Sequence, residues 1–101
     1  NRIYSLFANN GTMEQKRIVF AEDHSLISEM WGELIKNTGE FVILAKTKSV
    51  KESLHSVSSL QPDLLILDVM LSDGSSIDSI ETFRQSSPAT RILVLSGNAE
   101  L

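Results

Sequence analysis

The segment Leu64-Leu65-Ile66-Leu67-Asp68 decides the fold, because it is a continuous aliphatic run that ends in an acid. A run of this length without polar alternation is typical of a β-strand that is buried on both faces. Pro62 precedes the run and the turn residues Ser72-Asp73-Gly74 follow it, so the run is bounded on both sides. The segment therefore predicts a buried strand of a parallel sheet.

Three further apolar runs predict strands of the same kind. Amphipathic segments separate them, and the first has apolar residues at i, i+1, i+4, i+5, i+8 and i+9, which is a strong helical signature. Strands and helices thus alternate as β-α-β-α-β-α-β, which predicts an α/β fold with a doubly wound parallel sheet. The strand runs are Ile18-Val19-Phe20-Ala21, Phe41-Val42-Ile43-Leu44-Ala45 and Ile92-Leu93-Val94-Leu95, and the helical stripe is Leu26, Ile27, Met30, Trp31, Leu34 and Ile35.

Local signals mark where these helices begin and end. Gly39 is expected to cap the first helix, and Ser49 with Glu52 has the spacing of a capping box at the start of the second. A third, shorter helix around Phe83 is expected to end before Pro88. Within the first helix, Met30 and Trp31 have the spacing of core residues.

Composition excludes several classes of protein. The chain has 101 residues, of which 42% are hydrophobic and 22% charged, so it is not a disordered tail. It has no cysteine, which excludes a disulfide scaffold and a cysteine-based zinc site. A net charge of −4 argues against binding of a phosphate backbone by this piece alone. The absence of a long apolar run indicates a soluble, cytoplasmic domain.

Polar residues follow three of the four predicted strands. Glu22-Asp23 follow the first, Asp68 ends the third, and Ser96-Gly97 follow the fourth. Because parallel strands share a direction, these residues meet at the carboxyl edge of the sheet, where open α/β sheets bind ligands. Clustered carboxylates need a cation, and oxygen ligands favour Mg²⁺ over zinc. The alternative is that an acid after a strand only caps the next helix, a role that Asp23 or Ser25 could take.

These motifs, in this order, give residues 17–101 a resemblance to the receiver (CheY-like) domain of bacterial two-component response regulators. The opening Ala21-Glu22-Asp23-His24 is similar to that of the NarL/LuxR type. The resemblance implies a flavodoxin-like sheet that is truncated after its fourth strand, with the fourth helix, fifth strand and fifth helix absent. Residues 1–16 lie outside the resemblance and are interpreted as an expression tag or a natural N-terminal extension.

The resemblance also implies a role for each matching residue. Asp68 would accept a phosphoryl group from a sensor histidine kinase, with Ser96 and the backbone N–H of Gly97 holding its oxygens. Asp23, Glu22, Asp68 and the backbone carbonyl of Met70 would bind Mg²⁺. The domain would be a signalling module that catalyses only its own phosphorylation and dephosphorylation. It would control an output domain outside this chain, which the NarL/LuxR-like opening suggests is a DNA-binding transcription regulator.

Other interpretations remain open at this level. Phosphohydrolases with an aspartate nucleophile usually carry a second Asp two positions later, where this chain has Met70. A receiver-like interaction module that is never phosphorylated is the other alternative, because the family lysine that ends the fifth strand has no counterpart here. An uncovered fourth strand would favour a homodimer or chain exchange.

Three smaller signals complete the prediction. His24 is expected to make a local hydrogen bond, and His55 is expected to be solvated. The side chain of Met70 is expected to overhang the site and to tune the lifetime of the phosphoryl group.

Overall fold

The computed structural model describes residues 14–96. Gly97, which was predicted to offer a backbone N–H to the site, lies outside them. The predicted alternation of strands and helices is confirmed within this part, with a short hairpin and a 3₁₀ turn added after the third long strand. The elements are β1 (Lys16–Ala21), α2 (Ser25–Thr38), β2 (Phe41–Thr47), α3 (Val50–Leu60), β3 (Leu64–Asp68), β4 (Met70–Leu71), β5 (Gly74–Ser75), η1 (Ile77–Ser79), α4 (Ile80–Ser86) and β6 (Arg91–Leu95).

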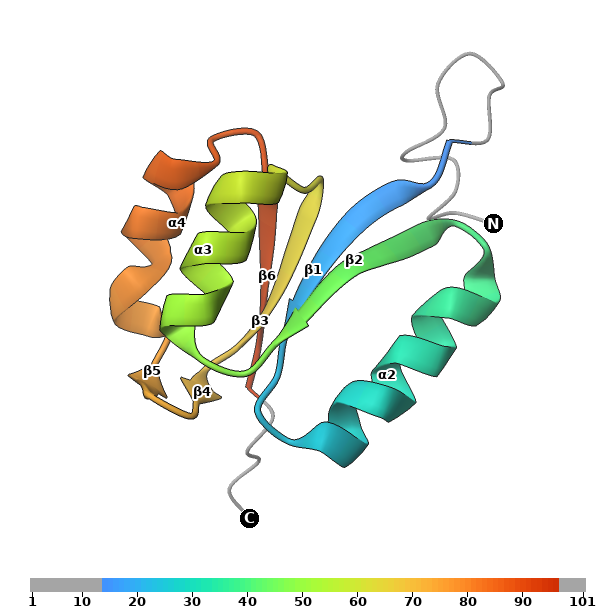
Figure 1. Ribbon diagram of the computed structural model, residues 1–101, viewed down its shortest axis with the longest axis horizontal. Helices are drawn as coiled ribbons and strands as arrows, with labels where there is room; N and C mark the ends of the chain where they lie inside the picture. Colours follow the sequence, from blue (N-terminus) through green and yellow to red (C-terminus); the bar gives the residue numbers. More distant parts are fainter. Residues whose placement is uncertain (1–13, 97–101) are drawn as a thin grey trace.

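The four long strands form one parallel sheet in the order β2-β1-β3-β6 (Figure 1). From β1 the chain moves outward to β2, and it then returns through α3 to place β3 on the other side of β1. The strand order therefore reverses between β1 and β3, which is the position where this architecture forms its binding crevice. Strands β4 and β5 form a separate antiparallel pair around the predicted turn at Ser72-Asp73.

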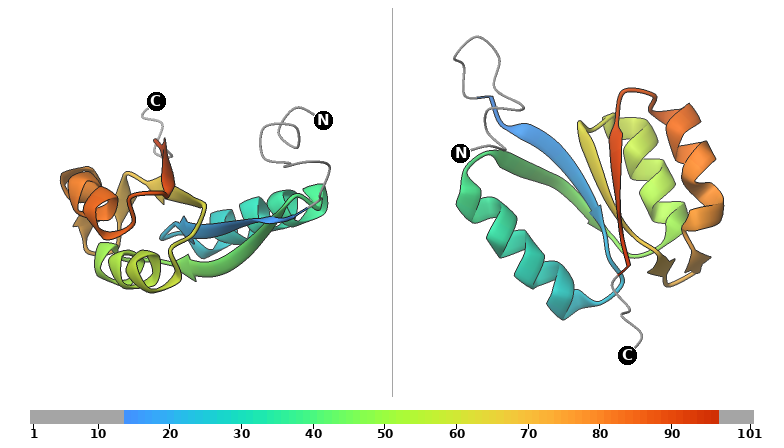
Figure 2. Two further views of the ribbon diagram at one scale, coloured as in Figure 1. Left: turned by 90° about the horizontal axis from the view of Figure 1, so that it is seen from above. Right: turned by 180° about the vertical axis from the view of Figure 1, so that it is seen from behind.

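Helices cover both faces of the sheet (Figure 2). Successive residues of β1 point to opposite faces, as the pleat requires. Val19 packs in one core cluster with Val57 of α3 and Phe83 of α4, whereas Phe20 packs in a second cluster with Ile35 of α2. All four residues of the predicted run 18–21 are at most 1% exposed, so the prediction of a doubly buried strand is confirmed for β1.

The predicted helix caps are present. Gly39 ends α2 with φ of 73°, a left-handed conformation that suits glycine, and its N–H donates to the Lys36 carbonyl at 3.1 Å. At the start of α3 the Ser49 hydroxyl accepts from the Glu52 N–H at 3.0 Å. The Glu52 carboxylate accepts in turn from the Lys48 N–H at 2.9 Å, so the reciprocal half of the box reaches one residue further back.

The start of α2 does not match the interpretation that Asp23 or Ser25 caps this helix. Neither Asp23 nor Ser25 is its N-cap, because the helix begins at Ser25 and His24 takes the cap position. The His24 side chain makes no capping hydrogen bond within residues 14–96. An acid at position 23 is therefore not explained by helix capping.

The core prediction for Met30 and Trp31 is wrong. Their exposed fractions are 55% and 39%, and the buried residues of α2 are instead Ser28, Gly32 and Ile35. The apolar stripe of this helix is wider than the surface that the sheet covers, so the face with small residues makes the close contact. Packing of Gly32 against β2, where Lys46 lies, shows how near the helix approaches.

The fourth long strand is also less buried than predicted. Leu93 is 49% and Val94 36% exposed. Within the described residues β6 is an edge of the sheet, with β3 as its neighbour. No helix between residues 14 and 96 has both the length and the apolar character that crossing a membrane requires.

Phe83 provides a test of this packing. It is 1% exposed in the cluster that joins α3 and α4 to the sheet, so Phe83→Ala should lower the free energy of unfolding by about 3–5 kcal/mol. The change is measured by urea denaturation followed by circular dichroism. Ile77→Ala, at a residue that is 47% exposed, is the control, and an equal loss in both variants would contradict the assigned core.

Candidate functional site

The site is built where β1 and β3 end side by side. Ala21 and Leu67 are paired in the sheet, so the next residues, Glu22 and Asp68, lie at the same edge. Both are buried, with exposed fractions of 4% and 6%. The Glu22 N–H donates to the Thr47 carbonyl at 2.9 Å, which fixes the backbone at the end of β1. The predicted meeting of these two acids is therefore present.

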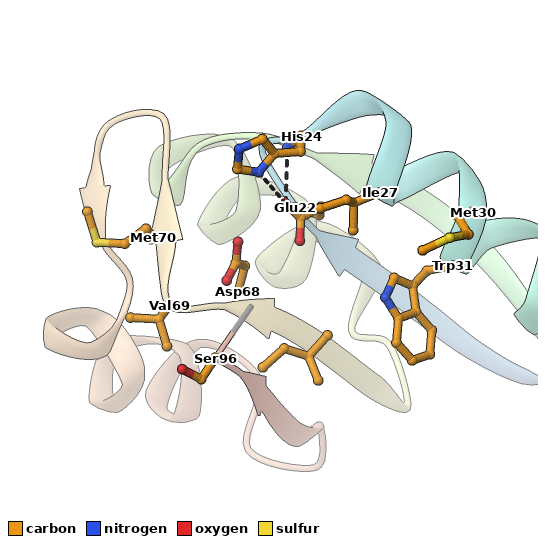
Figure 3. Close-up of a pocket in the computed structure, with 10 residues that line it drawn as sticks. Glu22, His24, Ile27, Met30, Trp31, Asp68, Val69, Met70 and Ser96 are labelled. Atoms are coloured by element: carbon orange, nitrogen blue, oxygen red, sulfur yellow. Dashed lines mark hydrogen bonds and ion pairs between the residues drawn. The ribbon is translucent and has the colours of Figure 1, made fainter. Parts of the chain in front are cut away.

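His24 lies close to both carboxylates. The possible ligand atoms of Glu22, His24 and Asp68 all lie within 4.8 Å of one another (Figure 3). The His24 backbone N–H donates to Glu22 Oε2 at 3.0 Å, and His24 Nδ1 lies 3.1 Å from the same oxygen. The expected local hydrogen bond of His24 is thus present, but its partner is a residue of the site. His55, on α3, is exposed as expected.

The three residues open into a pocket of about 890 Å³ that is polar at one end and apolar along its wall. Ser96, directly after β6, lines the polar end together with Glu22, His24 and Asp68. The apolar residues that line it are Ile27, Met30, Trp31, Val69, Met70 and Leu95. Met30 and Trp31, predicted as core, are thus residues of the pocket.

Of the other predicted site residues, Met70 lines the pocket, whereas Asp23 lies outside the cluster of possible ligands. The Met70 side chain lines the pocket and is 51% exposed, consistent with its expected place beside Asp68. Asp23 is half-buried and is not part of the cluster found among residues 14–96, so its role as a ligand stays a prediction. The sequence predicted no metal-binding role for His24, which the structure places within 4.8 Å of both acids; its position two residues after Glu22 is the signal that points to it.

Hydrogen bonds hold the backbone on both sides of Asp68. The hydroxyl of Ser76, which is fully buried, donates to the Asp68 carbonyl at 2.6 Å. The next residue, Val69, donates its N–H to the Leu95 carbonyl at 3.1 Å and accepts from the Ser76 N–H at 2.7 Å. The segment after Asp68 is therefore tied to β6 as well as to η1, which limits the directions in which the carboxylate can point.

Asp73, in the turn between β4 and β5, connects this segment to α3. Its carboxylate accepts from the backbone N–H of Val50 at 2.6 Å and of Lys51 at 3.1 Å, the first two residues of the helix. Ser72 N–H donates to the Lys48 carbonyl at 2.9 Å beside it. The bond from Val50, then that from Lys51, lowers the pKa of Asp73, because both donors stabilise the ionised form. The positive end of the helix dipole acts in the same direction.

The residues fit a hard divalent cation. Glu22 and Asp68 bring two nearly buried carboxylates to one point, and such a pair is stabilised when a cation offsets the repulsion between them. Carboxylate oxygens are also the ligands that Mg²⁺ and Ca²⁺ prefer. The cluster of two acids and a histidine is therefore a candidate metal centre.

Comparison with known proteins identifies the class. Residues 18–101 match the response regulator receiver domain, and the chain belongs to that family. The expected receiver fold is confirmed by a solved response regulator of the LuxR family from Aurantimonas sp. SI85-9A1, with a TM-score of 0.74 at 25% identity. That match covers 80% of this chain and 58% of the other, and it agrees with the predicted likeness to NarL/LuxR-type regulators.

Two curated relatives carry different printed functions, and each matches this chain over only part of its own length. The DNA-binding transcriptional activator DevR/DosR of Mycobacterium tuberculosis is 27% identical over 79 residues, which are 78% of this chain and 36% of the relative. A protein-glutamate methylesterase/protein-glutamine glutaminase of Syntrophomonas wolfei is 28% identical over 57 residues, 56% of this chain and 16% of the relative. The chain therefore spans well under half of either relative, and the shared part is the receiver.

The contact between Asp73 and α3 predicts a pH-dependent stability. Because the folded chain lowers the pKa of Asp73 below its ordinary 3.8, the stabilisation is present above that value and is lost as the pH falls through the lowered pKa. At about pH 6 the urea midpoint of Asp73→Asn should be lower than that of the original chain. The difference between the two midpoints should become smaller as the pH falls towards about 2.5.

Urea midpoints measured across that pH range check this expectation. Asp78→Asn, at an exposed carboxylate in η1, is the control for the loss of one negative charge. A gap between Asp73→Asn and the original chain that stays constant down to the lowest pH would contradict the assigned role of the carboxylate.

Proposed function

We propose that this chain accepts a phosphoryl group on Asp68 from the phosphohistidine of a sensor histidine kinase. The observation that carries the proposal is the pair of nearly buried carboxylates, Glu22 and Asp68, at adjoining strand ends of a receiver fold that opens into a pocket. A nucleophilic carboxylate at the end of a central strand is accessible to a donor that approaches the sheet edge. Membership of the receiver family supports the same reading.

The transfer would proceed in one displacement. An oxygen of Asp68 attacks phosphorus, the phosphorus–nitrogen bond of the phosphohistidine breaks, and the departing imidazole takes up a proton. The product is an acyl phosphate on Asp68. Attacking and transferred groups are both anionic, so the chemistry depends on offsetting that charge. Mg²⁺, held by Glu22, Asp23, Asp68 and the Met70 carbonyl, would supply this.

The residues around Asp68 would then act on the product. The hydroxyl of Ser96, at the end of the neighbouring strand, would donate to a phosphoryl oxygen, and the backbone N–H of Gly97 would do the same. The Val69 N–H donates a hydrogen bond to the Leu95 carbonyl. A displacement of Ser96 would therefore also displace β6 and the segment after Asp68. Such a shift is the kind of local change that biases a two-state packing.

The wider role is part of the same proposal. The receiver, residues 17–101, would control an output domain that binds DNA, as the printed name of the mycobacterial relative says of that protein. The kinase would be its partner in the cytoplasm, where the phosphoryl donors form. Pairing or chain exchange with a second copy stays a prediction, and so does the assignment of residues 1–16 to a tag or extension.

The first test is phosphorylation of the whole chain by acetyl phosphate with Mg²⁺. We expect a mass gain of one phosphoryl group that needs the metal, is labile to acid and base, and disappears in Asp68→Asn. Asp78→Asn, at an exposed acid outside the pocket, should label like the original chain. Intact-mass spectrometry measures the label in the original chain and both variants, with and without Mg²⁺, and again after treatment with acid or base.

Other outcomes would point elsewhere. Continuous turnover of phosphate monoesters, lost with Asp68→Asn, would favour the phosphohydrolase. A folded chain that neither labels nor binds beryllium fluoride would favour the interaction module that is never phosphorylated. Label retained in Asp68→Asn would place the acceptor at another residue.

Met70 gives a second, independent prediction. Its half-exposed side chain lines the pocket beside Asp68, so it should restrict the approach of water to the acyl phosphate. Met70→Ala should speed dephosphorylation several-fold, measured as decay of the phosphorylated mass after acetyl phosphate is removed. Met70→Leu keeps the bulk and should decay at the original rate. An unchanged decay in Met70→Ala would exclude this role.

A further inference from the structure

His24 is the residue of the site that the proposed function leaves unused. It is the N-cap of α2, and its side chain is 70% exposed at the mouth of the pocket. Helix capping does not explain the imidazole, because within residues 14–96 that side chain makes no capping bond. Its described contact is with Glu22, a buried acid of the site.

The backbone holds His24 in place beside that acid. The His24 N–H donates to Glu22 Oε2, so the residue cannot leave the carboxylate without losing a bond to a group that is 4% exposed. The imidazole lies above the Glu22 carboxylate, and the carboxylate of Asp68 reaches towards the same space (Figure 3). With ligand atoms of all three within 4.8 Å of one another, small side-chain rotations would let one ion touch each of them.

The ligand preferences of metal ions indicate which cations Glu22, His24 and Asp68 would bind. Mg²⁺ prefers oxygen ligands and retains its water, so an imidazole adds little to its binding. Divalent transition metals accept imidazole nitrogen readily, and they gain from a mixed set of one nitrogen and two carboxylates. We propose that His24 is a nitrogen ligand of the metal ion at this site, and that the site therefore prefers Co²⁺ to Mg²⁺ strongly and Mn²⁺ to Mg²⁺ to a smaller extent. This inference deepens the proposed function, because it concerns the same metal centre.

The test detects spectroscopically whether a nitrogen atom is a ligand of the bound metal. Mn²⁺ is bound to the whole chain without any phosphoryl donor, and electron spin-echo modulation is recorded for coupling to ¹⁴N. We expect an imidazole coupling in the original chain that changes to the ¹⁵N pattern when only histidine is ¹⁵N-labelled. That experiment needs no mutation, so it stands even if a variant folds poorly.

Two variants assign the coupling to a residue, because the chain has two histidines. His24→Gln should abolish the coupling and weaken Mn²⁺ binding by about tenfold or more, the range seen even for residues that only orient ligands. Its Mg²⁺ affinity should change much less. His55→Gln, at an exposed position of α3, should retain the coupling and both affinities.

The results that overturn the inference are distinct from those that overturn the proposed function. Mn²⁺ that binds without nitrogen coupling, with equal losses of Mn²⁺ and Mg²⁺ affinity in His24→Gln, would make His24 a positioning residue for Glu22 only. A coupling that survives in His24→Gln, or no Mn²⁺ binding at all, would also overturn it. Acetyl phosphate labelling of Asp68 that persists in any of these cases would leave the proposed function standing. A nitrogen coupling without labelling would support the metal ligand and contradict the phosphoryl transfer.

Discussion

The parallel pairing of β1 with β3 is the constraint on which the rest of the structure depends. It places Ala21 opposite Leu67, so that Glu22 and Asp68 emerge together at the edge where the strand order reverses. A shift of this register by one residue would turn Val19 and Phe20 to the wrong faces of the sheet and would separate the two acids. The burial of β1 on both faces therefore fixes the geometry of the site, since core and site share the same strand pairing.

Hydrogen bonds of the segment after Asp68 hold the backbone at this strand end in one position. Ser76 holds the Asp68 carbonyl, Val69 is bonded to β6, and Asp73 is bonded to the first residues of α3. Two elements that are distant in the sequence, α3 and β6, thus contact the segment within a few residues of Asp68. Under the proposed function, a change of charge at Asp68 would therefore act on a segment that is hydrogen-bonded to both β6 and the start of α3.

The two faces of the sheet are covered unequally within residues 14–96. On one face Val57 and Phe83 are almost fully buried, whereas on the other Leu93 of β6 is 49% exposed. Leu93 is paired with Ile66, so it lies on the face of the sheet whose core cluster includes Ile35 of α2. Ile27, Met30 and Trp31 of α2 line the pocket opposite the strand ends, together with Leu95 of β6, so a site built around two carboxylates is bordered by apolar side chains.

The sequence by itself determined what depends on local pattern. Apolar runs predicted the four long strands, Gly39 and the Ser49–Glu52 spacing predicted helix ends, and the shared direction of parallel strands predicted that Glu22 and Asp68 meet. Tertiary structure decided that the buried residues of α2 are Ser28, Gly32 and Ile35 and not most of its apolar stripe, because the small residues allow a closer approach to the sheet than Met30 and Trp31. It also decided that His24 lies near Asp68 as well as Glu22, since the end of β1 is placed by its pairing with β3 and by the Glu22 N–H bond to the Thr47 carbonyl of β2, and both are contacts between residues distant in the sequence.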